Sequence, residues 1–393
     1  MTYQELKQEE QQYVMNTYGR FAVALDRGEG AKLWDIEDKR YIDLTSGIGV
    51  CSVGYNNPTL IDAITEQAHK LMHVSNLFTT APMVQTAKTL VEATGMGKVF
   101  FSNSGAESNE GAIKLARKYS FDKYGKGRSK IITLWNSFHG RTVTTLNATG
   151  QEKFHNYFFP FTEGFDYAEA GNIEDVKAKA DDTTCAIMME LIQGEGGVLP
   201  LDAEFVHAVE AFCRERDLLL IIDEVQTGVG RTGSLFCFQQ YGIHPDVVTT
   251  AKGIAGGLPL GLVMAAKTCC DVLSPGTHAT TFGGSPTCCA AANAVLGIVN
   301  RPEFLDEVVK KGEYLKNGIL ALHSDKVQGV RGKGLMLGII VDAEERAELV
   351  AKCMDKGLLV LTAGTQAIRL LPPLTITYEE LDEALAIFKE ALV

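Results

Sequence analysis

The alternation of short apolar runs with helical patterns between residues 99 and 266 constrains the fold more than any other feature of the sequence. In the segment 202–217, for example, Phe205, Val209 and Phe212 lie on one face of a predicted helix. Strands that alternate with helices predict a mostly parallel sheet that is covered by helices on both faces. The predicted strands are 99–103, 130–135, 185–190, 218–223, 247–251 and 262–266.

The two ends of the chain have different patterns. Residues 32–44 alternate apolar and polar side chains around Asp38 and Lys39, which predicts a β-hairpin. Near the C-terminus, short apolar runs surround one helical pattern, and Thr377 forms a predicted capping box with Glu380 for a final helix. These runs are 334–342, 357–364 and 367–373. We therefore expect a smaller α+β unit in addition to the parallel sheet.

Composition argues against several classes of protein. The chain has 393 residues, a formal net charge of -12 and no locally basic run, so it is a poor candidate for binding nucleic acid. No apolar run approaches the ~20 residues that span a membrane. The nine cysteines are scattered and occur in no metal-binding spacing. Together with a polar, acidic N-terminus that lacks a targeting pattern, they predict a cytoplasmic protein without a metal.

Polar or glycine-rich segments follow the predicted strands. "SGAESNEGAIKLARK" follows the first strand, "NSFHGRT" the second and "DEVQTG" the run that ends at residue 222. "LIQGEGG" and "KGIAGGLP" follow two other strands. The carboxyl ends of parallel strands meet at one edge of a sheet, where open α/β sheets bind ligands. We therefore expect these segments to line one crevice.

Two of these segments could carry specific chemistry. Ser104, Gly105 and Ala106 stand immediately before a predicted helix. Free backbone N–H groups and the helix dipole suit a phosphate at such a place, although an ordinary helix N-cap would have the same pattern. Lys252 ends an apolar run and is followed by glycines. This lysine is either solvated or partly desolvated, and in the second case its lowered pKa would make it a nucleophile.

Asp223 follows a run of five apolar residues, 218–222, at a place where an ionised carboxylate needs a partner. A pair with Arg231, a helix N-cap and a bound cation are the alternatives. Pyridoxal 5'-phosphate (PLP) would account for the whole set, because it needs a lysine for its Schiff base, an acid that faces its pyridinium nitrogen and a phosphate cradle. Lys252 would form the Schiff base and then carry the proton between Cα and C4′.

Arg141 and Phe138 stand close together in the string "FHGRT". An arginine near the cofactor could bind a substrate carboxylate through two hydrogen bonds, and Phe138 could lie on the pyridine ring. A surface ion pair and a core aromatic side chain are the alternatives for these two residues.

Several strings together resemble the class-III PLP-dependent aminotransferases, from about Tyr18 to the C-terminus. Within this class the chain is most similar to the acetylornithine aminotransferases of arginine biosynthesis, through "NTYGRF", "GIGVCSVGYNNP" and "VSNLF". The strings that carry the resemblance to the class are "FSNSGAESNEGAIKLARK", "NSFHGRT", "IQGEGGV", "IIDEVQTGVGRTG", "TTAKGIAGGLPLG", "TTFGGSP" and "IRLLPPLTI".

The resemblance implies an α/β protein of the PLP-dependent transferase fold type I. Its large domain would hold a mostly parallel seven-stranded sheet, and a smaller α+β domain would be built from both ends of the chain. We predict that residues 1–48 join the small domain, that 49–296 form the large PLP-binding domain, and that 297–393 form the C-terminal small domain. The resemblance also implies a homodimer with active sites at the subunit interface.

The resemblance assigns roles to individual residues of this chain. Lys252 corresponds to the Schiff-base lysine and Asp223 to the partner of the pyridinium nitrogen. Glu195 and Arg369 correspond to a pair that separates when the enzyme changes substrate. The other correspondences are Gln226 with the ligand of the cofactor's O3′, Ser104, Gly105 and Ala106 with the phosphate cup, Phe138 with the stacking aromatic, Thr281 with a phosphate ligand from the partner subunit, and Arg141 and Tyr18 with substrate-binding residues.

These correspondences predict transfer of the terminal amino group of N-acetylornithine to 2-oxoglutarate, giving N-acetylglutamate 5-semialdehyde and glutamate. Sister activities on ornithine, succinyl-ornithine or 4-aminobutyrate are the first alternative, since a few pocket side chains decide between them. Candidates for that choice are Ser46 to Val50, Asn76 and Phe78. A PLP-dependent isomerase or mutase is a second alternative. A non-catalytic α/β binding protein or a nucleotide-dependent oxidoreductase is the alternative from a different class, but no GxGxxG follows the first strand.

Overall fold

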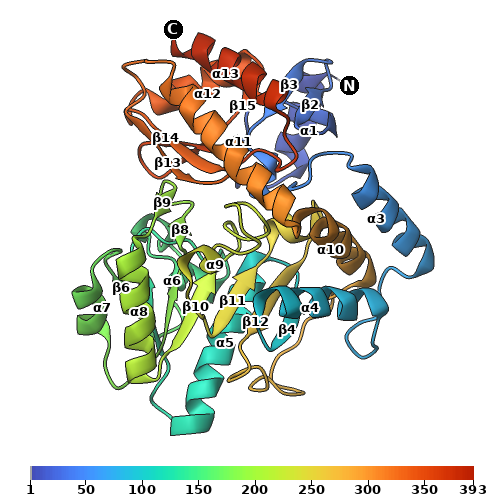
Figure 1. Ribbon diagram of the computed structural model, residues 1–393. Coiled ribbons are helices and arrows are strands. Elements are labelled where there is room, and N and C mark those ends of the chain that lie inside the picture. The colour runs from blue at the N-terminus through green and yellow to red at the C-terminus, as the bar shows by residue number, and fades with distance from the viewer. Residues whose placement is uncertain (1) are drawn as a thin grey trace.

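A computed structural model describes residues 2–393, and a seven-stranded sheet forms the centre of the larger part of this region (Figure 1). Its strand order is β4-β12-β11-β10-β7-β5-β6. β12 runs antiparallel to both neighbours, whereas the other pairs are parallel. The strands are β4 (Lys98–Ser102), β5 (Lys130–Leu134), β6 (Phe165–Ala168), β7 (Thr184–Met189), β10 (Leu219–Asp223), β11 (Val247–Thr250) and β12 (Gly261–Ala265).

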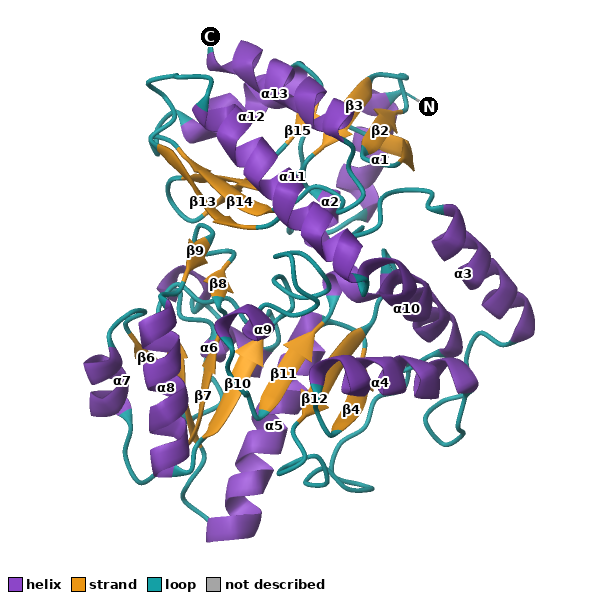
Figure 2. Cartoon of the chain, in the orientation of Figure 1, coloured by secondary structure: helices purple, strands orange, loops and turns teal. Residues whose placement is uncertain are grey.

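The sheet is buried on both faces, as the continuous apolar runs predicted. Along β5 and β10, neighbouring residues belong to two different apolar clusters. Ile131 and Ile221 pack with α5 (Gly105–Tyr124) on one face. Ile132 and Ile222 belong to the cluster on the other face, which includes α8 (Ala203–Arg216). The prediction of a mostly parallel α/β sheet is therefore confirmed, and Figure 2 shows helices on either side of its strands.

The remaining helices of the larger part lie outside this sheet. They are α3 (Pro58–Lys70), α4 (Ala81–Thr94), α6 (Val143–Ala148), α7 (Ile173–Lys179), α9 (Phe238–Tyr241) and α10 (Pro286–Val299). Shorter elements are α2 (Ser46–Gly49), η1 (Glu152–Phe154), η2 (Lys252–Ala255), β8 (Ile192–Gln193) and β9 (Leu199–Pro200).

A smaller four-stranded sheet, β1-β2-β3-β15, brings both ends of the chain together, and a second, β13-β14-β17-β16, is built from C-terminal strands alone. The predicted hairpin is confirmed, because β2 (Lys32–Asp35) pairs antiparallel with β3 (Arg40–Asp43). β3 then pairs with β15 (Leu358–Leu359), which comes from the far end of the chain. The domain limits proposed from the sequence stay a prediction. The other elements are β1 (Leu25–Glu29), β13 (Gly329–Lys333), β14 (Met336–Ile340), β16 (Leu361–Ala363), β17 (Ala367–Leu370), α11 (Pro302–Leu320), α12 (Arg346–Asp355) and α13 (Tyr378–Leu392).

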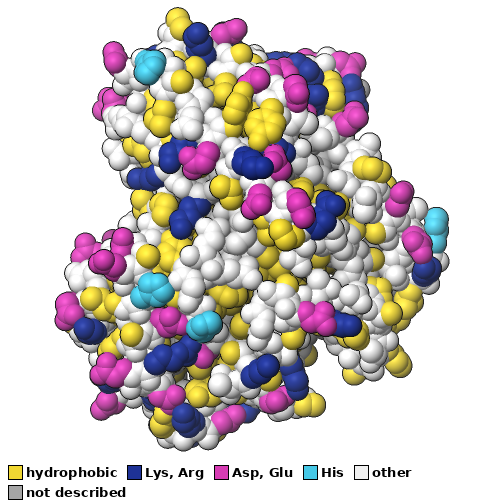
Figure 3. All heavy atoms as spheres, in the orientation of Figure 1, with side chains coloured by type: hydrophobic (Ala, Val, Ile, Leu, Met, Phe, Trp, Pro, Cys, Tyr) yellow, Lys and Arg dark blue, Asp and Glu magenta, His cyan; other side chains and the backbone are white. Residues whose placement is uncertain are grey.

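The ends of the chain and its surface complete the description. The capping box between Thr377 and Glu380 is present at the start of α13. At the other end, α1 (Tyr3–Tyr13) has no buried residue in the single chain. Acidic and basic side chains are interspersed on the face shown in Figure 3. No helix within residues 2–393 has the length and apolar character that crossing a membrane requires.

Candidate active site

A cavity of about 430 Å³ lies at the carboxyl ends of the central parallel strands. This volume falls within the range of small-molecule sites, roughly 300–1,000 Å³. Segments that follow β4, β5, β7, β10 and β11 all contribute to its wall. Most of the residues selected from the sequence line it, namely Ser104, Gly105, Ala106, Phe138, Arg141, Glu195, Asp223, Gln226 and Lys252.

The N-terminus of α5 forms one end of the cavity. Ser104 is the N-cap residue, and its hydroxyl accepts a hydrogen bond from the backbone N–H of Glu107 at 3.2 Å. Within residues 2–393 the backbone N–H groups of Gly105 and Ala106 have no acceptor. A Cβ on Gly105 would lie 2.6 Å from Cγ1 of Val225, so a side chain at position 105 would collide with Val225. The helix N-terminus therefore offers two free donors to an anion.

Lys252 stands just beyond the end of β11 and starts the short helix η2. Its φ of +46° lies in the left-handed region that favours glycine, so the surrounding structure holds this residue in a strained conformation. Burial lowers the pKa of the Lys252 ammonium, although the nearby Glu195 carboxylate acts in the opposite direction. No hydrogen bond or ion pair involves its ammonium within the described chain. A lysine in this state is suited to act as a nucleophile.

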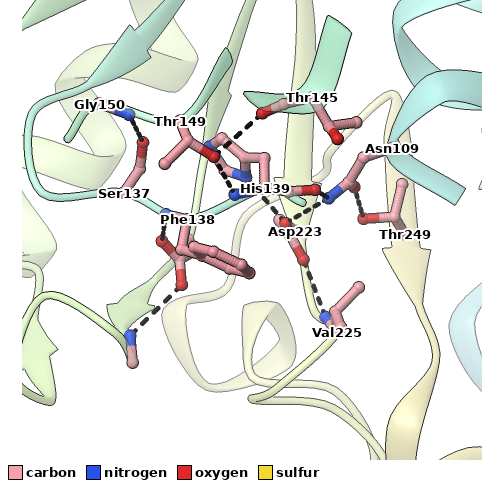
Figure 4. Close-up of polar contacts among 12 residues, drawn as sticks. Asn109, Ser137, Phe138, His139, Thr145, Thr149, Gly150, Asp223, Val225 and Thr249 are labelled. Carbon is pink, nitrogen blue, oxygen red and sulfur yellow. Dashed lines mark hydrogen bonds and ion pairs between the residues drawn. The ribbon is translucent and has the colours of Figure 1, made fainter. Parts of the chain in front are cut away.

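Asp223 ends β10 at the floor of the cavity and is only 3% exposed (Figure 4). Its Oδ2 accepts hydrogen bonds from Asn109 Nδ2 at 2.7 Å and from His139 Nδ1 at 2.8 Å. Its Oδ1 accepts one from the backbone N–H of Val225 at 3.0 Å. Three donors therefore hold this carboxylate in place at the wall of the cavity.

The alternative that Asp223 pairs with Arg231 is wrong. The Arg231 guanidinium is buried and donates instead to the backbone carbonyls of Leu335, at 3.0 Å, and Pro372, at 2.5 Å. Arg231 therefore connects the segment that follows β10 to the C-terminal part of the chain.

Phe138 and Arg141 come after β5 and line another part of the cavity wall. The backbone N–H of Phe138 donates to Glu190 Oε2 at 2.9 Å, and burial raises the pKa of this glutamate to about 7. The Arg141 guanidinium carbon lies 5.7 Å from the centre of the Phe138 ring and 4.1 Å from that of Phe154. Arg141 has no carboxylate partner within residues 2–393, so its donors are available to a substrate.

Glu195 and Arg369 form an ion pair at the edge of the cavity. Arg369 Nη1 donates to Glu195 Oε1 at 2.5 Å and to Gln226 Oε1 at 3.2 Å. Arg369 is 3% exposed and belongs to β17, whereas Glu195 follows β8 in the larger part of the chain. Burial acts to raise the pKa of Glu195, but the Arg369 charge and hydrogen bond outweigh it, and the pKa is lowered. The pair is therefore charged at neutral pH.

Thr281 and Tyr18 do not line the cavity of this single chain. Tyr18 is 70% exposed, and Thr281 lies on an exposed loop. The neighbouring Thr280 hydroxyl accepts a hydrogen bond at 2.9 Å from Asn103, which does line the cavity. The roles assigned to Thr281 and Tyr18 stay predictions.

Sequence reasoning missed Asn109, Glu190 and Phe154. Asn109 carried a usable signal, because it stands four residues after Gly105 and so shares its face of α5. Phe154 and Glu190 carried none, since they reach Arg141 and Phe138 only through the folding of separate segments. Within the part of the chain that the structure describes, no group of three or more His, Cys, Asp or Glu side chains is arranged to hold a metal ion.

The fold and site define a class of enzyme that comparison with known proteins identifies. The family model of the class-III aminotransferases matches residues 13–392, and the chain belongs to this family. Members of the family depend on PLP. The recognition of the family from the motifs and the choice of cofactor are thus confirmed.

Individual relatives are similar over nearly the whole chain. The acetylornithine aminotransferase of Haemophilus ducreyi is 48% identical, over 100% of this chain and 99% of that protein. A structure of N-acetylornithine aminotransferase from Stenotrophomonas maltophilia has a TM-score of 0.85 and 35% identity, and covers 98% of this chain and 97% of its own. The ornithine aminotransferase of Toxoplasma gondii, crystallised with partial occupancy of PLP at its active site, has a TM-score of 0.95 and 30% identity, covering 100% and 94%.

Proposed function

We propose that this chain transfers the terminal amino group of N-acetylornithine to 2-oxoglutarate, giving N-acetylglutamate 5-semialdehyde and glutamate. The observation that carries the proposal is the 48% identity, across the full length, with an acetylornithine aminotransferase. The site adds support, because it joins a desolvated lysine and a buried aspartate in one cavity. We further propose that the reaction serves arginine biosynthesis in the cytoplasm.

The donor set of the cavity fits PLP. Lys252 would hold the cofactor covalently, and its unpaired, desolvated amine suits that role. The free N–H groups of Gly105 and Ala106 would hold the phosphate, with Ser104 beside them. Asp223 would face the pyridine nitrogen, Phe138 would lie against the ring, and Gln226 would bind O3′. When bound, PLP supplies an electron sink for the electrons released at the carbon that bears the substrate amine.

Lys252 and Asp223 would carry out the proton chemistry. Once the substrate amine has displaced Lys252, Lys252 Nζ would accept a proton from the substrate carbon that bears the amine. It would then donate this proton to C4′ of the cofactor. Burial lowers the pKa of this amine, so a larger share of it is neutral and able to accept a proton near neutral pH. Asp223 would accept a hydrogen bond from the protonated pyridine nitrogen, and its own donors would hold it in position for that contact.

Arg141, Glu195 and Arg369 would distinguish the two substrates. N-acetylornithine reacts at an amine far from its carboxylate, and Arg141 would bind that carboxylate. During this half of the reaction Glu195 would keep Arg369 neutralised, as it does in the structure. Glutamate reacts beside its carboxylate, so Glu195 would release Arg369 to bind it. A paired resting state is reasonable, since an unpaired buried arginine is costly.

We also propose that the active enzyme is a homodimer in which Thr281 reaches the partner's phosphate site. The support is an exposed apolar patch that surrounds this loop. Leu77 is 88% exposed and Phe282 is 63% exposed, and the Phe282 ring centre lies 5.2 Å from that of His73. Patches of this kind mark protein interfaces. Sedimentation of the purified protein as a dimer, and as a monomer after Phe282→Asp, is the expected result.

Ornithine is the second candidate for the amine donor. The observation in its favour is the TM-score of 0.95 with an ornithine aminotransferase, which exceeds the 0.85 found for an N-acetylornithine enzyme. The sequence identities favour acetylornithine in return, at 35% against 30% for the same two structures. Fold similarity is shared across the whole class, whereas the donor depends on a few pocket side chains such as Val50, which lines the cavity.

A half-reaction with single amines tests the proposal. The PLP-loaded protein is mixed with N-acetylornithine, ornithine, succinyl-ornithine or 4-aminobutyrate in the absence of any oxo acid. We expect N-acetylornithine to convert the absorbance band of the lysine-bound cofactor to that of its aminated form faster than the other amines do. Lys252→Ala is the matched control and should show no conversion. Faster conversion by ornithine would replace the proposed donor, and conversion by none of the amines would contradict transamination.

A further inference from the structure

We propose that Asn109 is a positioning residue that fixes the carboxylate of Asp223 for the pyridine nitrogen of the cofactor, and that Thr249 sets the orientation of Asn109. The inference rests on the proposed use of this cavity by PLP. It concerns three buried side chains from three elements, α5, β10 and β11, that meet beneath the cavity (Figure 4).

The amide of Asn109 uses both of its N–H groups and its oxygen. Nδ2 donates to Asp223 Oδ2 at 2.7 Å and to the backbone carbonyl of His139 at 2.7 Å. Oδ1 accepts from the Thr249 hydroxyl at 2.7 Å. The opposite orientation would place Oδ1 against a carbonyl and a carboxylate, which only accept hydrogen bonds. The hydroxyl of Thr249 and these two acceptors therefore allow one orientation of the amide.

This fixed amide in turn restrains Asp223. With Asn109 and His139 both bonded to Oδ2 and Val225 bonded to Oδ1, the carboxylate is held at both oxygens and cannot rotate without breaking a bond. Bonds donated to a carboxylate favour its ionised form. A charged, immobile carboxylate keeps a proton on a pyridine nitrogen rather than taking it.

His139 alone is a weaker support for Asp223. Its Nδ1 donates to Oδ2, but its Nε2 is buried and has no hydrogen-bond partner within residues 2–393. Its ring is therefore held at one nitrogen only. Asn109 bonds to the His139 backbone carbonyl as well as to Asp223, so it holds both members of the pair.

The position of Asn109 on α5 links the two ends of the cofactor site. Gly105 and Ala106 in the first turn of this helix offer the free N–H groups, and Asn109 follows one turn later on the face of Gly105. One 20-residue helix thus places both the anion-binding end and the support of Asp223. Groups placed on a rigid element keep their relative positions better than groups on loops.

Two variants and one matched control test this role. Asn109→Ala removes both donors, and Thr249→Val removes only the hydroxyl that orients the amide. Thr133→Val is the control, because the Thr133 hydroxyl is also buried in the sheet but has no hydrogen-bond partner. The readouts are the equilibrium dissociation constant of PLP and the nitrogen-15 NMR resonance of cofactor labelled at its pyridine nitrogen. Neither readout requires turnover.

We expect Asn109→Ala to bind PLP about tenfold more weakly, since hydrogen bonds to charged groups are among the stronger ones. Its nitrogen-15 resonance should move toward the value of unprotonated pyridine. Thr249→Val should move both readouts in the same direction by less, and Thr133→Val should match the unchanged protein. A wild-type resonance and affinity in Asn109→Ala would overturn the inference.

The design separates this inference from the proposed function. If Asn109→Ala fails to fold, the nearly isosteric Thr249→Val decides, and wild-type behaviour in that variant overturns the inference. If the unchanged protein binds no PLP, the proposed function fails, and the role of Asn109 fails with it. If the unchanged protein binds PLP but both variants resemble Thr133→Val, only the role of Asn109 is overturned.

Discussion

Replacing Glu195 by Gln should impair the amine half of the reaction and spare the glutamate half. In the structure, Arg369 is 3% exposed and has two acceptors, Glu195 at 2.5 Å and Gln226 at 3.2 Å. Its Nε is buried and has no partner in the described residues. In Glu195→Gln the arginine keeps its positive charge beside the cavity while N-acetylornithine binds. Within residues 2–393 no other carboxylate forms an ion pair with it.

The size of the effect follows from the loss of one charge-assisted hydrogen bond. Such a bond contributes about 1.5–3 kcal/mol, and about 1.4 kcal/mol corresponds to a tenfold change in binding. We therefore expect the apparent KM of the N-acetylornithine half-reaction to rise at least about tenfold. The KM of the glutamate half-reaction should not rise and should instead fall, because Glu195 no longer competes with the substrate for Arg369.

Stopped-flow absorbance of the two half-reactions, each measured alone, checks this prediction. The pH dependence gives a second check. Because the pKa of Glu195 is lowered below its usual value, the ion pair is complete at neutral pH and is lost only as the pH falls through that lowered value. The ratio of the two half-reactions should therefore show no titration of Glu195 around neutral pH and should change only in acid. An equal loss in both half-reactions would refute the switching role.

Three further predictions address the other walls of the cavity. Burial lowers the pKa of Lys252, so the unfolded chain binds the lysine proton more tightly than the folded chain does. Apo Lys252→Met should therefore melt at a higher temperature than the apo wild-type protein at neutral pH, and this difference should shrink as the pH approaches 10.5. Equal melting temperatures at pH 7 would show that the lysine is solvated. Phe154→Leu should raise the KM of carboxylate substrates about threefold at unchanged kcat, through the weakened contact with Arg141, and Phe154→Tyr should restore it. Asp223→Asn should still bind PLP but turn over orders of magnitude more slowly in steady-state assays, whereas near-normal rates would make Asp223 structural.

The strands of the central sheet were predictable because burial on both faces requires continuous apolar runs. β5 and β10 illustrate this, since Ile131 and Ile132, like Ile221 and Ile222, face opposite clusters. β6 was missed because its sequence "FDYA" is only partly buried at the edge of the sheet. The antiparallel direction of β12 was not predictable either, since an apolar run is the same in both directions.

The candidate site was predictable where a residue's role depends on its place at a strand end. Asp223 and Lys252 follow β10 and β11, and the parallel arrangement alone brings them to one cavity. The support of Asp223 depends instead on side chains that meet through tertiary packing. Thr249 is one residue in an apolar strand, and nothing in the sequence shows that its hydroxyl reaches Asn109.

Arg369 is a similar case, because its partner Glu195 lies far away in the sequence and the pair was expected only from the resemblance. Thr281 and Tyr18 were assigned in the same way, and neither lines the cavity of the single chain. The pairing of residues from distant segments was thus predicted from the resemblance, whereas the site residues at strand ends were predicted from the sequence pattern itself.

The most direct test of the account is to locate the residue that binds PLP covalently. The PLP-loaded protein is treated with sodium borohydride, digested and sequenced by mass spectrometry. We expect the phosphopyridoxyl group on the peptide that contains Lys252 and on no other, and none on Lys252→Ala. A label on another lysine, or no label on a protein that binds PLP, would contradict the assignment of the cavity lined by Asp223 and Lys252 as the cofactor site.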